Sequence, residues 1–207
     1  MIAWSIEAAL QSNIFERVVV STDDEEIAGV ARQWGSEVPF IRPAELSDDF
    51  AGTDDVFLHA LKALTVDDGT ACCLYATAPF VQPEDLARGR VILIDHQATS
   101  AFSVTRYAYP IFRALKVNKQ GRVEMIWPEH RMTRSQDLPE TWHDAGQFYW
   151  VDVKKYLAEG KIFSDDSCPV EIPSWRVQDI DTEEDWQRAQ RIFETSIYKR
   201  RIQPIAE

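Results

Sequence analysis

Apolar positions along the 207-residue chain follow two periods, and each period predicts one kind of element. Apolar residues three or four positions apart predict amphipathic helices, and short continuous apolar runs predict buried strands. The helical stripes cover residues 1–10, 24–34, 53–64, 83–95, 153–159 and 182–197. The strand-like runs cover residues 15–20, 38–42, 71–75, 100–105, 147–151 and 175–180. This alternation predicts one α/β domain over residues 1–207, with a Rossmann-like, mostly parallel sheet covered by helices on both faces.

The alternation breaks between residues 106 and 144. Two short apolar runs, 112–117 and 122–127, flank the polar tetrapeptide Asn118-Lys119-Gln120-Gly121. A polar turn that ends in glycine between two such runs is typical of a β-hairpin. We therefore expect a small β-rich arm, inserted in the domain at about residues 106–144.

Composition narrows the class of partner. The net charge of −12 argues against nucleic acid or an anionic membrane surface as the main partner. No apolar run reaches the length of a membrane span, and no basic segment precedes an apolar one at the N-terminus, as a signal peptide requires. The three cysteines lack the spacing of zinc ligands and are typical of reduced core residues, so we expect a cytoplasmic protein.

The acidic segment near the end of the chain carries the first candidate chemistry. Asp179 and Asp181 are two residues apart at the end of an expected strand, where their side chains would share a face. Two carboxylates so placed can hold one hard divalent cation. Thr182 followed by Asp185 is an acidic variant of the helix-capping box, so capping alone is the alternative. In a parallel sheet, ligands bind beyond the carboxyl ends of the strands, where this segment is expected to lie.

Five strings in the loops carry a resemblance to a known family. They are Val20-Ser21-Thr22-Asp23, Arg42-Pro43-Ala44-Glu45-Leu46, Leu74-Tyr75-Ala76-Thr77-Ala78-Pro79, Gln136-Asp137-Leu138-Pro139 and Asp179-Ile180-Asp181-Thr182. In this order, across nearly the whole length, the chain resembles the CMP-sugar synthetases, or acylneuraminate cytidylyltransferases. The resemblance implies the fold of nucleotide-diphospho-sugar transferases. It also implies a nucleotidyltransferase that uses CTP, a nonulosonic acid and Mg²⁺ to give a CMP-sugar and pyrophosphate.

Two strings favour pseudaminic acid as the sugar. Tyr75 to Pro79 stands where enzymes for sialic acid have Gln-Pro-Thr-Ser-Pro. His143 to Tyr149 stands where they have Arg-Pro-Asn-Gly-Ala-Ile-Tyr. Both segments match sugar-facing loops of the family, and here the chain is more similar to the members that act on pseudaminic acid. Sialic acid stays the alternative substrate.

The resemblance also implies roles for individual residues. Asp179 and Asp181 match the catalytic carboxylates that bind the metal. The positions that match the nucleotide site are Arg42, Ala51 and Thr53. The positions that match the sugar site are Tyr75, Thr77, His143 and Gln147, with Arg134 as a displaced equivalent of the family's arginine. Residues 106–144 match the arm that reaches a second subunit, which implies a homodimer.

One family element has no counterpart in the sequence. Family members begin with a strand and a basic, glycine-containing loop that holds the triphosphate, whereas Met1 to Ser5 matches the helix after that loop. We therefore expect that residues upstream of Met1 are needed for full activity, and that this chain alone has weak or no activity. A non-catalytic binding subunit is the alternative. A metal-dependent phosphohydrolase would need an Asp-x-Asp-x-Thr nucleophile after the first strand, which Val20 to Asp23 does not supply.

Overall fold

The computed structural model describes residues 1–48 and 50–195. Its helices are α1 (Ile2–Ser12), α2 (Glu25–Gln33), α3 (Thr53–Ala63), α4 (Pro83–Asp95), α5 (Val153–Glu159) and α6 (Glu183–Thr195). Its strands are β1 (Thr70–Leu74), β2 (Ser100–Arg106), β3 (Leu115–Val117), β4 (Val123–Met125), β5 (Trp142–Asp152) and β6 (Ser167–Glu171). Each predicted helix is present within two residues of its expected bounds, and only 196–197 of the last one lie outside the described residues.

The central sheet has four strands in the order β1-β5-β2-β6. β2 and β6 are parallel, and β5 pairs antiparallel with both β1 and β2. Three of the four strands therefore run in one direction, and β5 runs in the other. The prediction of an α/β fold with a mostly parallel sheet is confirmed, with β5 as the reversed strand.

Three predicted strands do not form. The run at 15–20 makes a single parallel bridge, from Val19 to Glu37 just before the run at 38–42, and in the described part of the chain no strand lies alongside to extend it. The run at 175–180 is instead a single 3-10 turn, η5 (Ser174–Arg176), followed by a loop. Pro173 starts this turn, and its carbonyl accepts the N–H of Arg176. The outer strand β6 was not predicted, because Pro169 interrupts its apolar pattern.

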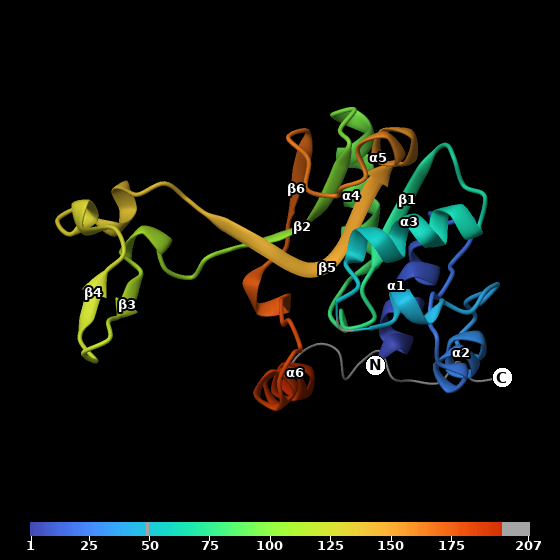
Figure 1. Cartoon of the computed structure of the whole chain (residues 1–207), viewed down its shortest axis with the longest axis horizontal. Coiled ribbons are helices and arrows are strands. Elements are labelled where there is room, and N and C mark those ends of the chain that lie inside the picture. The colour runs from blue at the N-terminus through green and yellow to red at the C-terminus, as the bar shows by residue number, and fades with distance from the viewer. Residues whose placement is uncertain (49, 196–207) are drawn as a thin grey trace.

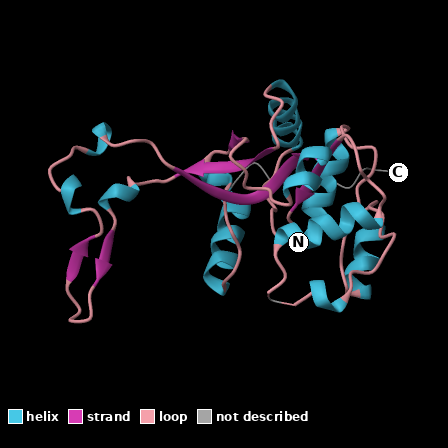
Figure 2. Cartoon of the chain, turned by 45° about the horizontal axis from the view of Figure 1, so that its top comes forward, coloured by secondary structure: helices cyan, strands magenta, loops and turns pink. Residues whose placement is uncertain are grey.

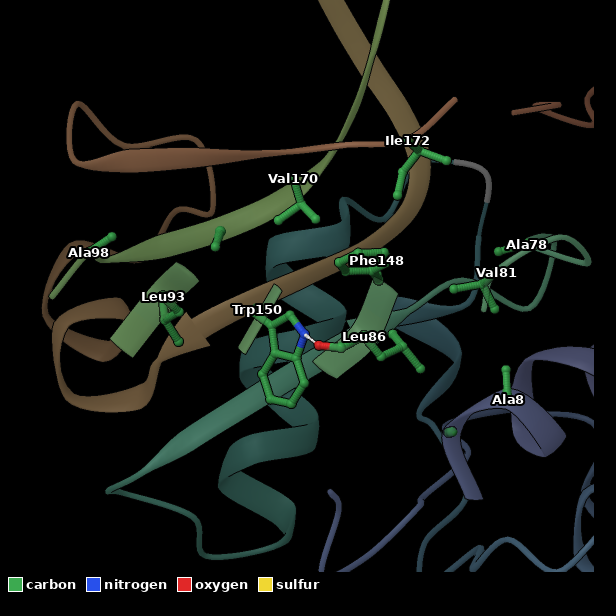
Figure 3. Packing of buried hydrophobic residues seen from close by; sticks show 12 residues of the cluster. Ala8, Ala78, Val81, Leu86, Leu93, Ala98, Phe148, Trp150, Val170 and Ile172 are labelled. Atoms are coloured by element: carbon green, nitrogen blue, oxygen red, sulfur yellow. Dashed lines mark hydrogen bonds between the residues drawn. The ribbon is translucent and has the colours of Figure 1, made fainter. Parts of the chain in front are cut away.

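Helices cover both faces of the sheet, as the alternation along β5 requires. Phe148 and Trp150 face α4, where they pack with Leu86 and Leu93 (Figure 3). The indole N–H of Trp150 donates to the carbonyl oxygen of Leu86 at 3.0 Å. Tyr149 and Val151 of β5 face the opposite side of the sheet. There they pack with Phe57 and Leu61 of α3 and with Tyr156 of α5.

The predicted arm is present and extends away from the sheet (Figures 1 and 2). β3 and β4 form its antiparallel hairpin, with Val117 opposite Val123. The arm leaves the sheet after Arg106 and returns at Trp142, and these two residues are paired in the β2–β5 register. It is therefore an insertion between two neighbouring strands.

Candidate active site

A bulge near the start of β5 shapes the site. Val104 is opposite Asp144 and Phe102 is opposite Tyr149, so four residues of β5 face the single residue Ser103. The buried Ser103 Oγ accepts the backbone N–H groups of residues 147 and 148, both at 3.2 Å. Gly146 within the bulge has φ of +60°, a conformation that glycine adopts without strain. Bulges of this kind re-aim the side chains of a strand.

The loop with Asp179 and Asp181 lies against this bulge. A Cβ on Gly146 would lie 3.6 Å from the Asp179 carboxyl group. Partial burial, and then the negative charge of Asp181, raise the pKa of Asp179, with smaller contributions from Asp144 and Asp185. The carboxylates thus gather at one end of the sheet. In residues 1–48 and 50–195, no three His, Cys, Asp or Glu side chains are close enough to hold a metal by themselves.

Helix capping falls to other residues of the same segment. The Thr182 N–H and hydroxyl donate to the Asp185 carboxylate at 3.0 and 2.6 Å, and the Asp185 N–H donates to the Thr182 Oγ at 3.2 Å. The predicted capping box at the start of α6 is therefore present. Because Thr182 and Asp185 provide it, Asp179 and Asp181 are not needed as caps.

The residues predicted for the nucleotide line one cavity. Arg42, Ala51 and Thr53 come together there with Tyr75, in a space of about 780 Å³ that also follows β1. The Thr53 and Tyr75 hydroxyls are 2.5 Å apart. Arg42 Nε donates to the Ser47 Oγ at 3.1 Å, and this bond orients the guanidinium group. The three residues predicted for the nucleotide thus share one cavity with the end of β1.

A smaller cavity of about 260 Å³ adjoins the first across Thr53 and Tyr75. Asp144, Tyr149 and Phe163 line it as well. The Tyr149 hydroxyl donates to Asp144 Oδ2 at 2.6 Å. Burial, and then this bond to Asp144, raise the pKa of Tyr149 well above its ordinary value, so the hydroxyl stays protonated. The cavity therefore has an aromatic wall and three aspartates, Asp54, Asp55 and Asp144.

The other four residues predicted for the sugar lie in four different places. Gln147 is buried and donates from Nε2 to the carbonyl oxygen of Arg176 at 2.6 Å. This bond joins the bulge of β5 to the turn η5. The His143 ring packs against Tyr107 in a tilted arrangement, with 4.8 Å between ring centroids, at the base of the arm. Thr77 is in the turn after β1 and lines neither cavity. Arg134 is in the arm, where it pairs with Asp137.

Sequence reasoning found only Thr53 and Tyr75 among the residues that line the smaller cavity, and it missed Asp144, Tyr149 and Phe163 among others. Asp144 and Tyr149 belong to the string that marks the second sugar-facing loop, and an acid five positions from a tyrosine was the available signal. Phe163 follows α5 in a segment without a clear period, so no pattern singled it out.

Comparison with known proteins decides the family. The cytidylyltransferase family profile matches residues 1–205. The chain belongs to the cytidylyltransferase family. The pseudaminic acid cytidylyltransferase of Campylobacter jejuni subsp. jejuni serotype O:2 is 39% identical over 95% of this chain and 86% of its own length. N-acylneuraminate cytidylyltransferase A of Danio rerio is 31% identical over 92% of this chain and 44% of its own length.

Solved structures show the same fold for this cytidylyltransferase. CMP:2-keto-3-deoxy-manno-octonic acid synthetase complexed with CTP matches 93% of this chain and 88% of that chain, with a TM-score of 0.62 and 16% identity. 4-Diphosphocytidyl-2C-methyl-D-erythritol synthase of Anaerococcus prevotii matches 93% and 85%, with a TM-score of 0.62 and 12% identity. Among the described residues, no helix combines the length and apolar character that a membrane span needs.

Proposed function

We propose that this cytidylyltransferase transfers CMP from CTP to pseudaminic acid and releases pyrophosphate. One observation carries the proposal: the loop with Asp179 and Asp181 lies against a strand bulge through Asp179, and the bulge also carries Asp144, which lines the smaller of two adjoining cavities. The identity of 39% to a pseudaminic acid enzyme over 95% of the chain supports this choice of sugar.

The reaction is a substitution at the α-phosphorus of CTP. The anomeric hydroxyl of the sugar forms a new O–P bond and loses its proton, while the bond from the α-phosphorus to the bridging oxygen breaks and pyrophosphate leaves. Such transfers ask the protein mainly for positioning and for neutralisation of charge. Asp179 and Asp181 have the hard oxygen donors that suit Mg²⁺, and phosphate oxygens or water would complete the coordination. When bound, Mg²⁺ would neutralise charge on the phosphates.

The two cavities suit the two substrates. In the larger one, Arg42, Ala51 and Thr53 offer a cation, a backbone group and a hydroxyl to the cytidine. In the smaller one, aromatic faces can hold the acyl methyl groups of the sugar, and the Asp144 carboxylate can accept an N–H or O–H of the sugar. Tyr75 lines both cavities and would lie between the substrates.

We further propose a homodimer that forms through the arm. Tyr109, Val117 and Met132 are among its exposed apolar side chains, at 83%, 70% and 87% exposure. An isolated two-stranded hairpin is marginally stable in water, so such an apolar surface favours a partner. The arm is also where Arg134 lies, and a second subunit is the route by which it would reach a sugar carboxylate. The described cysteines are unpaired thiols, which suits the proposed cytoplasmic location.

The test is release of pyrophosphate from CTP and Mg²⁺ with either pseudaminic acid or sialic acid. We expect pyrophosphate release at a low rate with pseudaminic acid, and a further fall in Asp179→Asn and Asp181→Asn, because each loses a metal-binding charge. Asp95→Asn, on the exposed end of α4, is the matched control and should keep full activity. Turnover with sialic acid alone would select the alternative substrate. Binding of CTP without turnover of either sugar would support a non-catalytic subunit.

A further inference from the structure

A buried ion pair joins α4 to the turn that precedes the two carboxylates. Asp85 is 4% exposed in the first turn of α4, and the side chain of Arg176 is 12% exposed. The guanidinium of Arg176 binds both carboxylate oxygens of Asp85, with Nη1 on Oδ2 and with Nη2 at 3.2 Å from Oδ1. This two-pronged contact fixes direction as well as distance. Nη2 of Arg88 donates to Asp85 Oδ1 at 3.0 Å and to the Glu171 carbonyl oxygen at 2.7 Å.

The same arginine is held at its backbone. Its carbonyl oxygen accepts Nε2–H of the buried Gln147 at 2.6 Å, and this glutamine belongs to the bulge that touches Asp179. Arg176 therefore connects three parts of the molecule that are far apart in the sequence: α4, the bulge of β5 and the segment with the carboxylates.

The segment needs such an anchor because no strand holds it. β6 ends at Glu171, η5 ends at Arg176, and α6 begins at Glu183. Between the turn and the helix, Val177 and Ile180 pack on buried clusters, but among the described residues no ladder of backbone hydrogen bonds fixes where Asp179 and Asp181 point. Three residues of extended chain span about 10 Å, so release of residue 176 would leave the first carboxylate much freedom.

We propose that the Asp85–Arg176 pair is the positioning device for the metal-binding carboxylates. The inference rests on the proposed metal-binding role of Asp179 and Asp181. Neither Asp85 nor Arg176 touches the substrates in this scheme; the pair sets the geometry of the loop. Metal sites lose affinity by 10–100-fold when the residues that orient their ligands are removed.

The test measures Mn²⁺ binding by electron paramagnetic resonance in the presence of CTP. We expect Asp85→Asn and Arg176→Gln each to weaken Mn²⁺ binding about tenfold. The double variant should bind no more weakly than either single one, because both substitutions break the same contact. Arg176→Lys, which keeps the charge and loses the two-pronged contact, should restore part of the affinity.

Leu93→Ala is the matched control for loss of stability. It removes a buried side chain from the same helix without touching the loop, so it should lower the melting temperature and leave Mn²⁺ affinity within twofold of the wild type. Hydrogen exchange gives a second readout. The amides of β5 serve as the internal reference for global stability. When these amides exchange at the same rate in both variants, the amides of residues 177–182 should exchange faster in Arg176→Gln than in Leu93→Ala.

Asp179→Asn and Asp181→Asn separate the inference from the proposed function. If they abolish Mn²⁺ binding while the Asp85 and Arg176 variants bind like the wild type, the positioning role is overturned and the metal role stands. If they leave Mn²⁺ binding unchanged, the metal role itself fails, and the inference falls with it. If Leu93→Ala loses as much Mn²⁺ affinity as the Asp85 and Arg176 variants do, the loss reflects a general effect on stability. This result would also overturn the inference.

Discussion

Ser103 shows how one hydroxyl organises the candidate site. It is fully buried, and its oxygen accepts two consecutive backbone N–H groups of β5 that the bulge removes from the ladder. Buried N–H groups without an acceptor cost about 1–3 kcal/mol each. The hydroxyl oxygen of Ser103, opposite the bulge, therefore stabilises it by accepting both N–H groups.

We predict that Ser103→Ala lowers the free energy of unfolding by about 1–3 kcal/mol and raises the KM for the sugar. The smaller cavity should lose its shape, because Asp144 and Tyr149 flank the bulge. Ser36→Ala is the control, since its buried hydroxyl bonds to the carbonyl oxygen of Ala31 in another part of the chain. Urea unfolding and steady-state kinetics measure the two effects. A normal sugar KM in Ser103→Ala would contradict the prediction.

The pKa shifts of two aspartates predict opposite dependences of stability on pH. Asp179 has a raised pKa in the folded chain, so the fold favours its protonated form, and this contribution is lost as pH rises through the folded pKa. Asp179→Asn should therefore be at least as stable as the wild type at pH 7, with an advantage that shrinks toward the ordinary pKa of about 3.9. Melting temperatures across this range measure it.

Asp185 gives the matched comparison, because its bond to Thr182 lowers its pKa. Its stabilising contribution is present above the ordinary aspartate pKa and is lost as pH falls through the folded pKa. Asp185→Asn should therefore be less stable than the wild type at pH 7 and approach it in acid. If both variants are more stable than the wild type at pH 7, or both are less stable, the opposite directions of the two pKa shifts are contradicted.

At the scale of elements, α4 approaches the sheet closely at Gly89. A Cβ at this position would lie 2.7 Å from a ring carbon of Trp150 and 2.9 Å from one of Phe148. Neither ring can move aside easily, because both are buried in the core and the indole is bonded to Leu86. The glycine therefore sets the spacing between helix and sheet.

We predict that Gly89→Ala costs about 1–3 kcal/mol in the free energy of unfolding, as other overpacked core substitutions do. Gly29→Ala in α2 is the matched control, because nothing lies within 4 Å of its Cβ. There the higher helix propensity of alanine should add up to about 1 kcal/mol. Urea unfolding of both variants at 25 °C tests the pair, and equal stabilities would contradict it.

Helices were predictable from the sequence because their apolar stripes are local. Strands were less so, because a strand needs a neighbour that the sequence does not name. The apolar runs at 15–20 and 38–42 lack such a neighbour, whereas Ser167–Glu171 gains one in β2 despite its proline. The site follows the same rule. Its strings were recognisable one by one, but Asp85 and Arg176 are 91 residues apart, and only the fold joins them.

At the scale of the whole molecule, the exposed apolar side chains of the arm predict its role in assembly. Val117→Lys should weaken the proposed homodimer, because it places a charge on an apolar surface of the arm. Val91→Lys changes another exposed valine, at 54% exposure on α4, and should leave the mass unchanged. Sedimentation velocity at several protein concentrations measures the mass. A monomeric wild type would contradict the dimer outright.

The way the arm is attached has a consequence for how such proteins diversify. Its two ends meet at one pair of residues, Arg106 and Trp142, on adjacent strands. The entropy of closing a loop grows only slowly with its length, so residues can be gained or lost between these ends at little cost to the fold. The register of β2 and β5 need not change when residues are gained or lost in the arm. Lineages can therefore alter the arm by insertion and deletion, while the cavities and carboxylates evolve separately by substitution.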